Sequence, residues 1–349
     1  MFRACRRLLA TCKHAVGSPE KKCPALISIL TVLVLTAGLP VGYLTASPAE
    51  PAGNGTDASR QVVITIDDLP KIMGSDTIES ATQVTAKIVA ALARHQAPAL
   101  GFVIGRQVFM EDQVDARLDL LRQWLDAGSD LGNHSFSHPS FNSMDPASYQ
   151  DDVLHGDLFP RRLMEEKGRT LRYFRHPYNQ TGPTAEIKSG FRAFMASRDY
   201  IIAPFTVEHA DYAFNKIWLD ARERGDEEGA RSIRDAYMEY LETAFDFAEE
   251  LTLDTFGAPM PQIFLIHAND LNAVCLDAML TRLQERGYSF VSMDEAMEHP
   301  AYATADEYVG TNGISWLHRW RHSLGLPDRL RDEPDPPTWV LKAWQAAQK

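Results

Sequence analysis

Cysteine is almost missing from this chain of 349 residues. Three of the four cysteines, Cys5, Cys12 and Cys23, lie in the first 24 residues, which leaves Cys275 alone in the body of the protein. A single cysteine excludes an internal disulfide there, and the lack of a Cys-x-x-Cys pair excludes the common thiolate metal sites. Cys275 falls in an apolar helical pattern, so we interpret it as a small core residue.

Basic residues are also scarce beyond residue 24. Residues 1–24 hold six Lys or Arg and one Glu, so the remainder has 29 basic and 46 acidic residues. The chain lacks internal repeats and low-complexity blocks, and its composition is that of a globular protein. An acidic body is a poor candidate for nucleic-acid binding, because that function requires a basic surface.

No charged residue occurs from residue 24 to residue 49. Residues 25–44 are mostly apolar and have about the length that crosses a bilayer. Because basic residues precede this segment, the positive-inside rule keeps residues 1–24 in the cytoplasm and exports the rest. Residues 45–60 are rich in Ala, Pro, Gly, Ser and Thr, a composition typical of a flexible linker.

The apolar segment 25–44 is either a signal anchor or a signal peptide. Its length favours a retained anchor, whereas Gly38, Pro40 and the small residues at 47–49 suit a cleaved signal. We therefore expect the protein in the cell envelope, on the periplasmic or extracellular face of the cytoplasmic membrane, or secreted if the segment is cleaved. The membrane is an expected partner through residues 25–44, and the sequence leaves the oligomeric state open.

Short apolar runs alternate with amphipathic segments after residue 60. The predicted strands are 62–66, 99–105, 130–133, 171–174, 200–204, 262–267 and 288–292. The predicted helices are 77–95, 114–127, 146–167, 184–197, 216–253 with a break near Gly225 and Gly229, and 271–286. Alternation of this kind predicts an α/β fold with a parallel sheet. We predict a distorted seven-stranded (β/α) barrel over residues 61–300, and a C-terminal extension, residues 301–349, that packs on or beside it without a chemical role.

Ionisable residues follow four of the predicted strands. The first strand ends in Asp67 and Asp68, the third in HSFSH (134–138), the fourth in RHPY (175–178) and the sixth in His267. A polar turn would explain the aspartate pair by itself. A barrel, however, brings the carboxyl ends of its strands to one rim, which is where such folds build their sites. The four strand ends together therefore predict one site.

The histidines of HSFSH have the spacing of metal ligands. His134 and His138 are separated by three residues, which lets two imidazoles meet one ion. A carboxylate from Asp67 or Asp68 would complete a His-His-carboxylate set that leaves a position open for water. Zn2+ is the expected metal, although nitrogen and oxygen ligands also admit Co2+, Ni2+ or Fe2+. Because adjacent strand residues point to opposite faces, we expect the two aspartates to have different roles.

The ordered set TIDD, HSFSH, RHPY and LIH resembles the polysaccharide deacetylases of carbohydrate esterase family four, the NodB homology domain. The resemblance covers roughly residues 62–292 and implies a NodB-type barrel. It also implies that Asp67 is the general base and that Asp68, His134 and His138 hold the metal.

The same resemblance implies roles for the two later motifs. Arg175 would position the base, and Tyr178 would lend its backbone N–H to an oxyanion hole. Leu265 would line the acetyl pocket, and His267 would be the general acid. These roles also suit the residue types, because a histidine can protonate an amine leaving group near neutral pH.

Some features depart from the family pattern. The acidic, Trp-bearing fourth motif of the family cannot be identified in this sequence. Asp211 is the best candidate for an acidic residue that adjusts the pKa of His267. The helical segment 216–253 occupies the position of a groove wall. His176 is as compatible with a structural hydrogen bond as with a substrate contact, and Asn269 with Asp270 is typical of a helix cap.

The sequence thus predicts a hydrolase acting on carbon–nitrogen bonds other than peptide bonds. Its expected substrate is an acetylated carbohydrate such as peptidoglycan or a chitin-like oligomer, attacked at an N-acetyl or O-acetyl group. Two alternatives remain. One is a hydrolase of the same fold that cleaves a small non-sugar amide, and the other is an inactive, membrane-tethered carbohydrate-binding protein.

Overall fold

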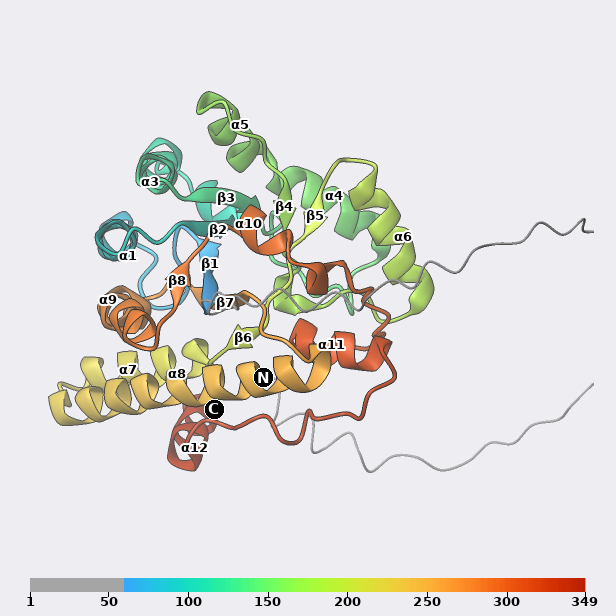
Figure 1. Ribbon diagram of the computed structural model, residues 1–349. Helices are drawn as coiled ribbons and strands as arrows, with labels where there is room; N and C mark the ends of the chain where they lie inside the picture. The colour runs from blue at the N-terminus through green and yellow to red at the C-terminus, as the bar shows by residue number, and fades with distance from the viewer. Residues whose placement is uncertain (1–59, 349) are drawn as a thin grey trace, which may run out of the picture. The chain divides into compact units, whose positions relative to one another are not determined.

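A parallel β-sheet forms the centre of residues 60–348, the part of the chain that the computed structural model describes (Figure 1). Its strand order is β5-β4-β3-β2-β1-β7-β6, and β8 pairs with the start of β1. The strands are β1 (Gln61–Leu69), β2 (Ala99–Val103), β3 (Asp130–Asn133), β4 (Tyr173–Phe174), β5 (Ile201–Ile202), β6 (Val207–Glu208), β7 (Gln262–His267) and β8 (Ser289–Phe290).

The central strand β1 is buried at every residue from Val62 to Leu69. It pairs in parallel with β2 on one side and with β7 on the other. A strand covered on both faces needs a continuous apolar run, which is what residues 62–66 provide. The strand is longer than the predicted one, so Asp67 and Asp68 lie within its carboxyl end and not after it.

The sheet curls into a half-barrel. No backbone ladder joins its two edge strands, β5 and β6, within residues 60–348. All seven predicted strands are present, but β6 is an eighth strand that the sequence does not predict. Two residues are too few to show a strand pattern, so the predicted strand count is corrected from seven to eight.

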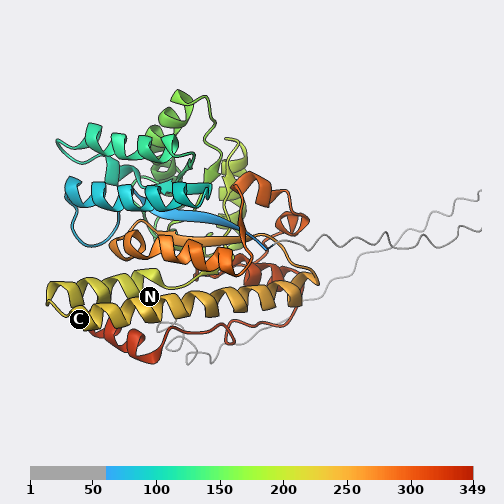
Figure 2. The same cartoon turned by 60° about the vertical axis from the view of Figure 1, so that its left-hand side comes forward.

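Helices surround the sheet (Figures 1 and 2). They are α1 (Ile78–Arg94), α2 (Gly105–Val108), α3 (Val114–Asp126), α4 (Pro146–Gly156), α5 (Leu158–Glu166), α6 (Ala185–Ala196), α7 (Asp211–Glu223), α8 (Glu227–Phe256), α9 (Asp270–Glu285), α10 (Met293–Met297), α11 (Trp316–Ser323) and α12 (Thr338–Ala346). Short 3-10 helices span Pro177–Asn179 and Pro300–Ala303.

Side-chain caps set several helix boundaries. The carboxylate of Asp145 accepts from two backbone N–H groups at the start of α4. After the break at Gly225, the carboxylate of Asp226 caps α8 by accepting from the backbone N–H of Gly229. The predicted single helix 146–167 is in fact two helices, α4 and α5, which meet at Asp157. Cys275 is buried in α9, as predicted.

The C-terminal extension belongs to the same compact unit as the half-barrel. Helix α11 packs against α8, and α12 packs against α7. The backbone N–H of Trp316 donates to the carbonyl of Phe205, 2.9 Å away, in the segment that connects the two edge strands. The extension therefore lies beside the open side of the half-barrel.

The predicted N-terminal regions, 1–24, 25–44 and all of 45–60 except its last residue, lie outside the described residues. Among residues 60–348, no helix is both long and apolar enough to cross a membrane.

Candidate active site

The carboxyl end of β1 contains a bulge. Ile66 pairs with Gly101 and Leu69 pairs with Val103, so β1 has one more residue than β2 between these pairs. Within the bulge, Asp68 adopts a left-handed backbone conformation with φ 68°. Bulges of this kind redirect side chains near functional sites.

Both carboxylates of β1 consequently approach the same histidine. The Nε2 atom of His134 lies 3.3 Å from Oδ1 of Asp68 and 3.8 Å from Oδ2 of Asp67. Strict alternation along a strand would send the two carboxylates to opposite faces. The bulge at Asp68 thus brings together two groups that the sequence pattern separates.

The loop after β3 carries both histidines of the predicted metal site. His138 Nε2 lies 3.5 Å from Asp68 Oδ1, and the rings of His134 and His138 are 5.0 Å apart. One ligand atom from each of Asp68, His134 and His138 lies within 4.8 Å of the other two. The structure therefore brings the three predicted ligands together.

The donor atoms of this triad fit a divalent metal ion. The Nδ1 atom of His134 lies 2.8 Å from the carbonyl oxygen of Arg175, which can only accept, so Nδ1 carries the proton and Nε2 keeps its lone pair. A metal-ligating histidine commonly donates its other ring N–H to a backbone carbonyl, which fixes the tautomer in this way. The Oδ1 atom of Asp68 is buried and has no hydrogen-bond partner among the described residues. A metal would supply the partner that this oxygen lacks.

The charge states of Asp68 and His138 are also compatible with a bound divalent metal ion. Burial tends to raise the pKa of Asp68, but the adjacent histidines, with His138 foremost, outweigh it and the pKa lies below its usual range. Burial lowers the pKa of His138 to about 4, against the attraction of Asp68. A carboxylate beside the neutral imidazole of His138 suits metal binding, which requires deprotonated ligands.

Arg175, at the end of β4, holds Asp67. Its Nη1 donates to Oδ1 of Asp67 at 2.8 Å and to the hydroxyl of Thr65 at 2.7 Å, while Nη2 donates to the carbonyl of Pro204 at 2.8 Å. The guanidinium also lies 4.4 Å from the ring centre of Phe102 and is fully buried. Asp67 therefore has a fixed orientation beside the triad.

Tyr178 lies in the short 3-10 helix that follows Arg175. Its backbone is left-handed, with φ 55°, and so is that of Asn179, with φ 54°. The ring of Tyr178 lies 4.6 Å from the ring of His138 and remains partly exposed. The structure thus places Tyr178 at the rim of the metal triad.

His267, at the end of β7, is paired with Asp211. Its Nδ1–H donates to Oδ1 of Asp211 at 2.7 Å, and its backbone N–H donates to Oδ2 at 2.8 Å. Burial lowers the pKa of His267, but the charge and hydrogen bond of Asp211 outweigh it and raise the pKa to about 10. The side chains of Asn269 and Asn272 also donate to Oδ2 of Asp211.

Asp211 is the residue that the sequence reasoning identified only weakly. It occupies the first position of α7, 56 positions before His267, and it is almost fully buried. The only sequence signal is an acidic residue in the first turn of a helix that follows a strand, and many such residues are simple surface acids.

The remaining predicted residues are buried. Leu265 is buried in β7, two residues before His267, and pairs with Thr65 of β1. The imidazole of His176 is buried, and its Nδ1 lies 3.1 Å from the hydroxyl of Tyr149, which supports its structural interpretation. Asn269 caps α9 through the backbone N–H of Asn272, as predicted.

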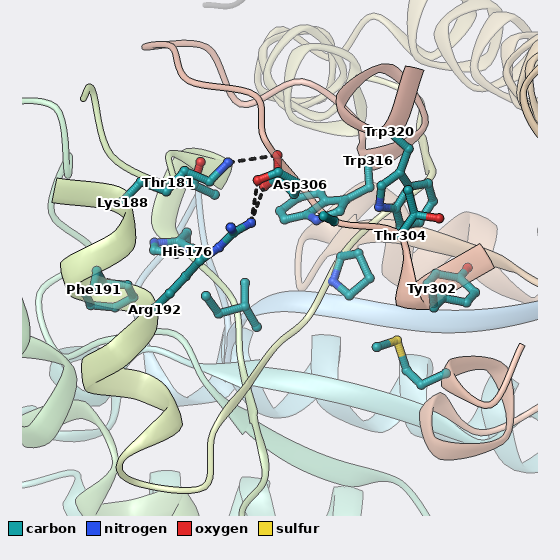
Figure 3. Close-up of a pocket in the computed structure, with 14 residues that line it drawn as sticks. His176, Thr181, Lys188, Phe191, Arg192, Tyr302, Thr304, Asp306, Trp316 and Trp320 are labelled. Carbon is teal, nitrogen blue, oxygen red and sulfur yellow. Dashed lines mark hydrogen bonds and ion pairs between the residues drawn. The ribbon is translucent and has the colours of Figure 1, made fainter. Parts of the chain in front are cut away.

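A cavity of about 230 Å3 lies between α6 and the C-terminal extension (Figure 3). Lys188, Arg192, Asp306 and Trp316 are among its lining residues, and the metal triad is not. Two of its lining residues adjoin Arg175: His176 follows it in the chain, and the carbonyl of Pro204 accepts from its Nη2.

Comparisons with known proteins identify a matching family model and several similar sequences. The model of the polysaccharide deacetylase family matches residues 54–192. The peptidoglycan-N-acetylglucosamine deacetylase PgdA of Listeria monocytogenes is 21% identical over 254 residues, which cover 72% of this chain and 42% of that protein. A chitooligosaccharide deacetylase of Bradyrhizobium is 29% identical over 120 residues, which cover 34% of this chain and 47% of that protein. The chain spans less than half the length of these curated relatives.

Two solved structures are also similar. The peptidoglycan deacetylase PdaC of Bacillus subtilis has 18% sequence identity and a TM-score of 0.44, over 69% of this chain and 91% of that one. A CE4 family pseudoenzyme of Bacillus anthracis has 18% identity and a TM-score of 0.46, over 69% of this chain and 66% of that one.

Proposed function

We propose that this chain, whose residues 54–192 match the model of the polysaccharide deacetylase family, is a metal-dependent deacetylase. It hydrolyses N-acetyl groups, or O-acetyl groups, of an envelope or extracellular polysaccharide such as peptidoglycan or a chitin-like oligomer. The observation that carries the proposal is the convergence of the metal triad, the Asp67–Arg175 pair and the His267–Asp211 pair at the ends of three parallel strands and the loop after a fourth.

The metal is held by Asp68, His134 and His138. When bound, it supplies a Lewis acid and lowers the pKa of a water molecule at the site. Zn2+ fits this nitrogen and oxygen donor set, and Co2+, Ni2+ and Fe2+ are compatible with it.

Asp67 is the general base. It accepts a proton from the water that attacks the acetyl carbonyl, and the ion pair with Arg175 keeps its second oxygen turned toward His134. The backbone N–H of Tyr178 donates to the carbonyl oxygen as negative charge develops there. Leu265 lines the pocket for the acetyl methyl group.

His267 is the general acid. Its Nε2–H gives a proton to the sugar nitrogen as the C–N bond breaks, which releases acetate and a free amine. Asp211 fixes the ring through Nδ1 and stabilises its protonated form. For an O-acetyl group the same proton goes to the departing sugar oxygen.

The direct test measures acetate release by protein reconstituted with Zn2+, from N-acetylglucosamine oligomers, peptidoglycan and a small non-sugar amide. We expect release from at least one glycan, and a loss of at least about 100-fold in Asp67→Asn and His134→Ala, since each removes a component of the catalytic set. Undiminished release in both variants would refute the assignment. Release from the amide alone would favour the small-amide hydrolase, and glycan binding without any acetate release would favour the inactive binding protein.

A further inference from the structure

The C-terminal extension contacts the loop that carries Tyr178. We call residues 304–323 the brace segment and residues 177–181 the Tyr178 loop. The brace segment lies outside the residues that match the family model. Composition and periodicity predict no chemical role for the brace segment, yet two of its residues, Arg319 and Gly313, contact this loop directly.

The Tyr178 loop has an unfavourable backbone. Tyr178 and Asn179 are consecutive non-glycine residues in the left-handed region, with φ 55° and 54°. For residues with a Cβ atom this region is sterically costly, so two in succession persist only where neighbouring structure holds them.

Arg319 supplies that support from one side. Its Nη2 donates to the carbonyl of Asn179 and its Nη1 to the hydroxyl of Thr181, both at 2.7 Å. Its Nε donates to the carbonyl of Ile314 at 3.0 Å, and its side chain is fully buried. The planar guanidinium thus fixes the end of the Tyr178 loop to the brace segment.

Gly313 packs directly on Tyr178. A Cβ atom at Gly313 would lie 2.0 Å from the carbonyl oxygen of Tyr178, so only glycine allows the two backbones to approach this closely. The adjacent Thr311 carbonyl accepts from the side-chain amide of Asn142, 2.8 Å away, in the region that follows the metal-binding loop.

The brace segment is itself attached to α6. Lys188 lies 2.8 Å and Arg192 3.4 Å from the carboxylate of Asp306 (Figure 3). Arg319 also lies 3.4 Å from this carboxylate. A buried carboxylate shared by three cations holds one end of the segment in place while Arg319 and Gly313 contact the loop.

We propose that Arg319 and Gly313 of the brace segment are positioning residues, which hold the backbone N–H of Tyr178 in the geometry required for the oxyanion. The proposal rests on the deacetylase function for its kinetic consequence. Its structural consequence, an ordered Tyr178 loop, is independent of any activity.

The test compares Arg319→Gln with Arg321→Gln. Arg321 is a matched control, since it is a buried arginine on the same helix that donates to Pro327 and Thr255 and not to the Tyr178 loop. We expect Arg319→Gln to lower kcat about 10- to 100-fold, because a small displacement of one oxyanion donor has effects of this size. KM and the Zn2+ stoichiometry stay unchanged, and Arg321→Gln keeps kcat within about twofold.

Hydrogen exchange gives a readout that does not depend on turnover. Amide exchange in residues 177–181 should become faster in Arg319→Gln and not in Arg321→Gln. Gly313→Ala is the second variant, with the same expected pattern, in case Arg319→Gln does not fold. Equal kcat losses in the two arginine variants would overturn the proposed positioning role of Arg319 and Gly313. Unchanged amide exchange in the Tyr178 loop would overturn it as well. A wild-type protein without deacetylase activity would instead refute the proposed function. Amide exchange in the Tyr178 loop would then still test whether Arg319 and Gly313 hold this loop.

Discussion

At the scale of single residues, the backbone of Asp68 decides how β1 contributes to the site. Two adjacent aspartates on a regular strand face opposite sides. The left-handed conformation of Asp68 removes this separation, so Asp67 faces Arg175 and Asp68 faces the histidines from the same side of the sheet. A sequence pattern cannot predict this conformation, since aspartate adopts it only occasionally.

The pairing of His267 with Asp211 predicts a pH dependence. A general acid must be protonated, and Asp211 raises the pKa of His267 to about 10, so kcat should decline only as the pH rises through that region. In Asp211→Asn the pKa of His267 falls, and the alkaline decline of kcat should move to lower pH. Steady-state rates between about pH 6 and pH 11 measure the shift.

Asp270→Asn is the control for this prediction. This variant also removes one carboxylate charge, but from a residue that pairs with Lys71 at 2.9 Å. The alkaline decline of kcat in Asp270→Asn should therefore match that of the wild type. An unshifted profile in Asp211→Asn would show that His267 is not the acid.

At the scale of elements, α4 holds the loop that carries the two histidines. The carboxylate of Asp152 accepts from the backbone N–H groups of Phe136 and Ser137 and from the hydroxyl of Ser137. Gly156 of the same helix lies so close that a Cβ atom there would be 2.2 Å from the carbonyl carbon of Ser135. The metal-binding loop therefore depends on a helix that contributes no ligand.

Gly156→Ala should disturb this contact. The backbone of Ser135 cannot yield as a flexible side chain would, so we expect a loss of about 3 kcal/mol in the free energy of unfolding. Because Ser135 follows His134, we also expect Zn2+ affinity to fall. Urea denaturation and competition with a chromophoric chelator measure the two effects.

Gly190→Ala is the matched control. Gly190 lies inside α6, and a Cβ atom there would meet nothing within 4 Å. This change should stabilise the protein by about 0.5 to 1 kcal/mol, because alanine is the better helix former. If Gly156→Ala behaves like Gly190→Ala, α4 does not support the loop.

At the scale of the whole molecule, the proposed metal ligands Asp68, His134 and His138 connect β1 to the loop after β3. A ligand that binds only the folded state stabilises it by about 2.7 kcal/mol at 100 times its dissociation constant. We therefore expect Zn2+ to raise the thermal midpoint by several degrees and a chelator to reverse the rise.

His138→Ala should abolish most of this response, whereas His322→Ala, which removes an exposed histidine on α11, should keep it. Differential scanning calorimetry with and without Zn2+ distinguishes the two. If neither Zn2+ nor the chelator changed the thermal midpoint of the wild type, the assignment of Asp68, His134 and His138 as ligands would be contradicted.

The sequence by itself determined the approximate positions of seven of the eight strands and which ionisable residues lie at or just after their carboxyl ends. Hydrophobic runs and helical periods are local properties, so the seven predicted strands and most helices are present. The spacing of His134 and His138 is local too, and the structure brings Asp68 to both.

Only the tertiary structure decided the contacts that complete the site. Asp211 reaches His267 across 56 positions, and Arg319 reaches Asn179 across 140. These contacts follow from how helices pack on the curled sheet. Local sequence patterns do not predict such long-range packing. For the same reason, periodicity left the C-terminal extension without a role, while its fold places Arg319 and Gly313 against the Tyr178 loop.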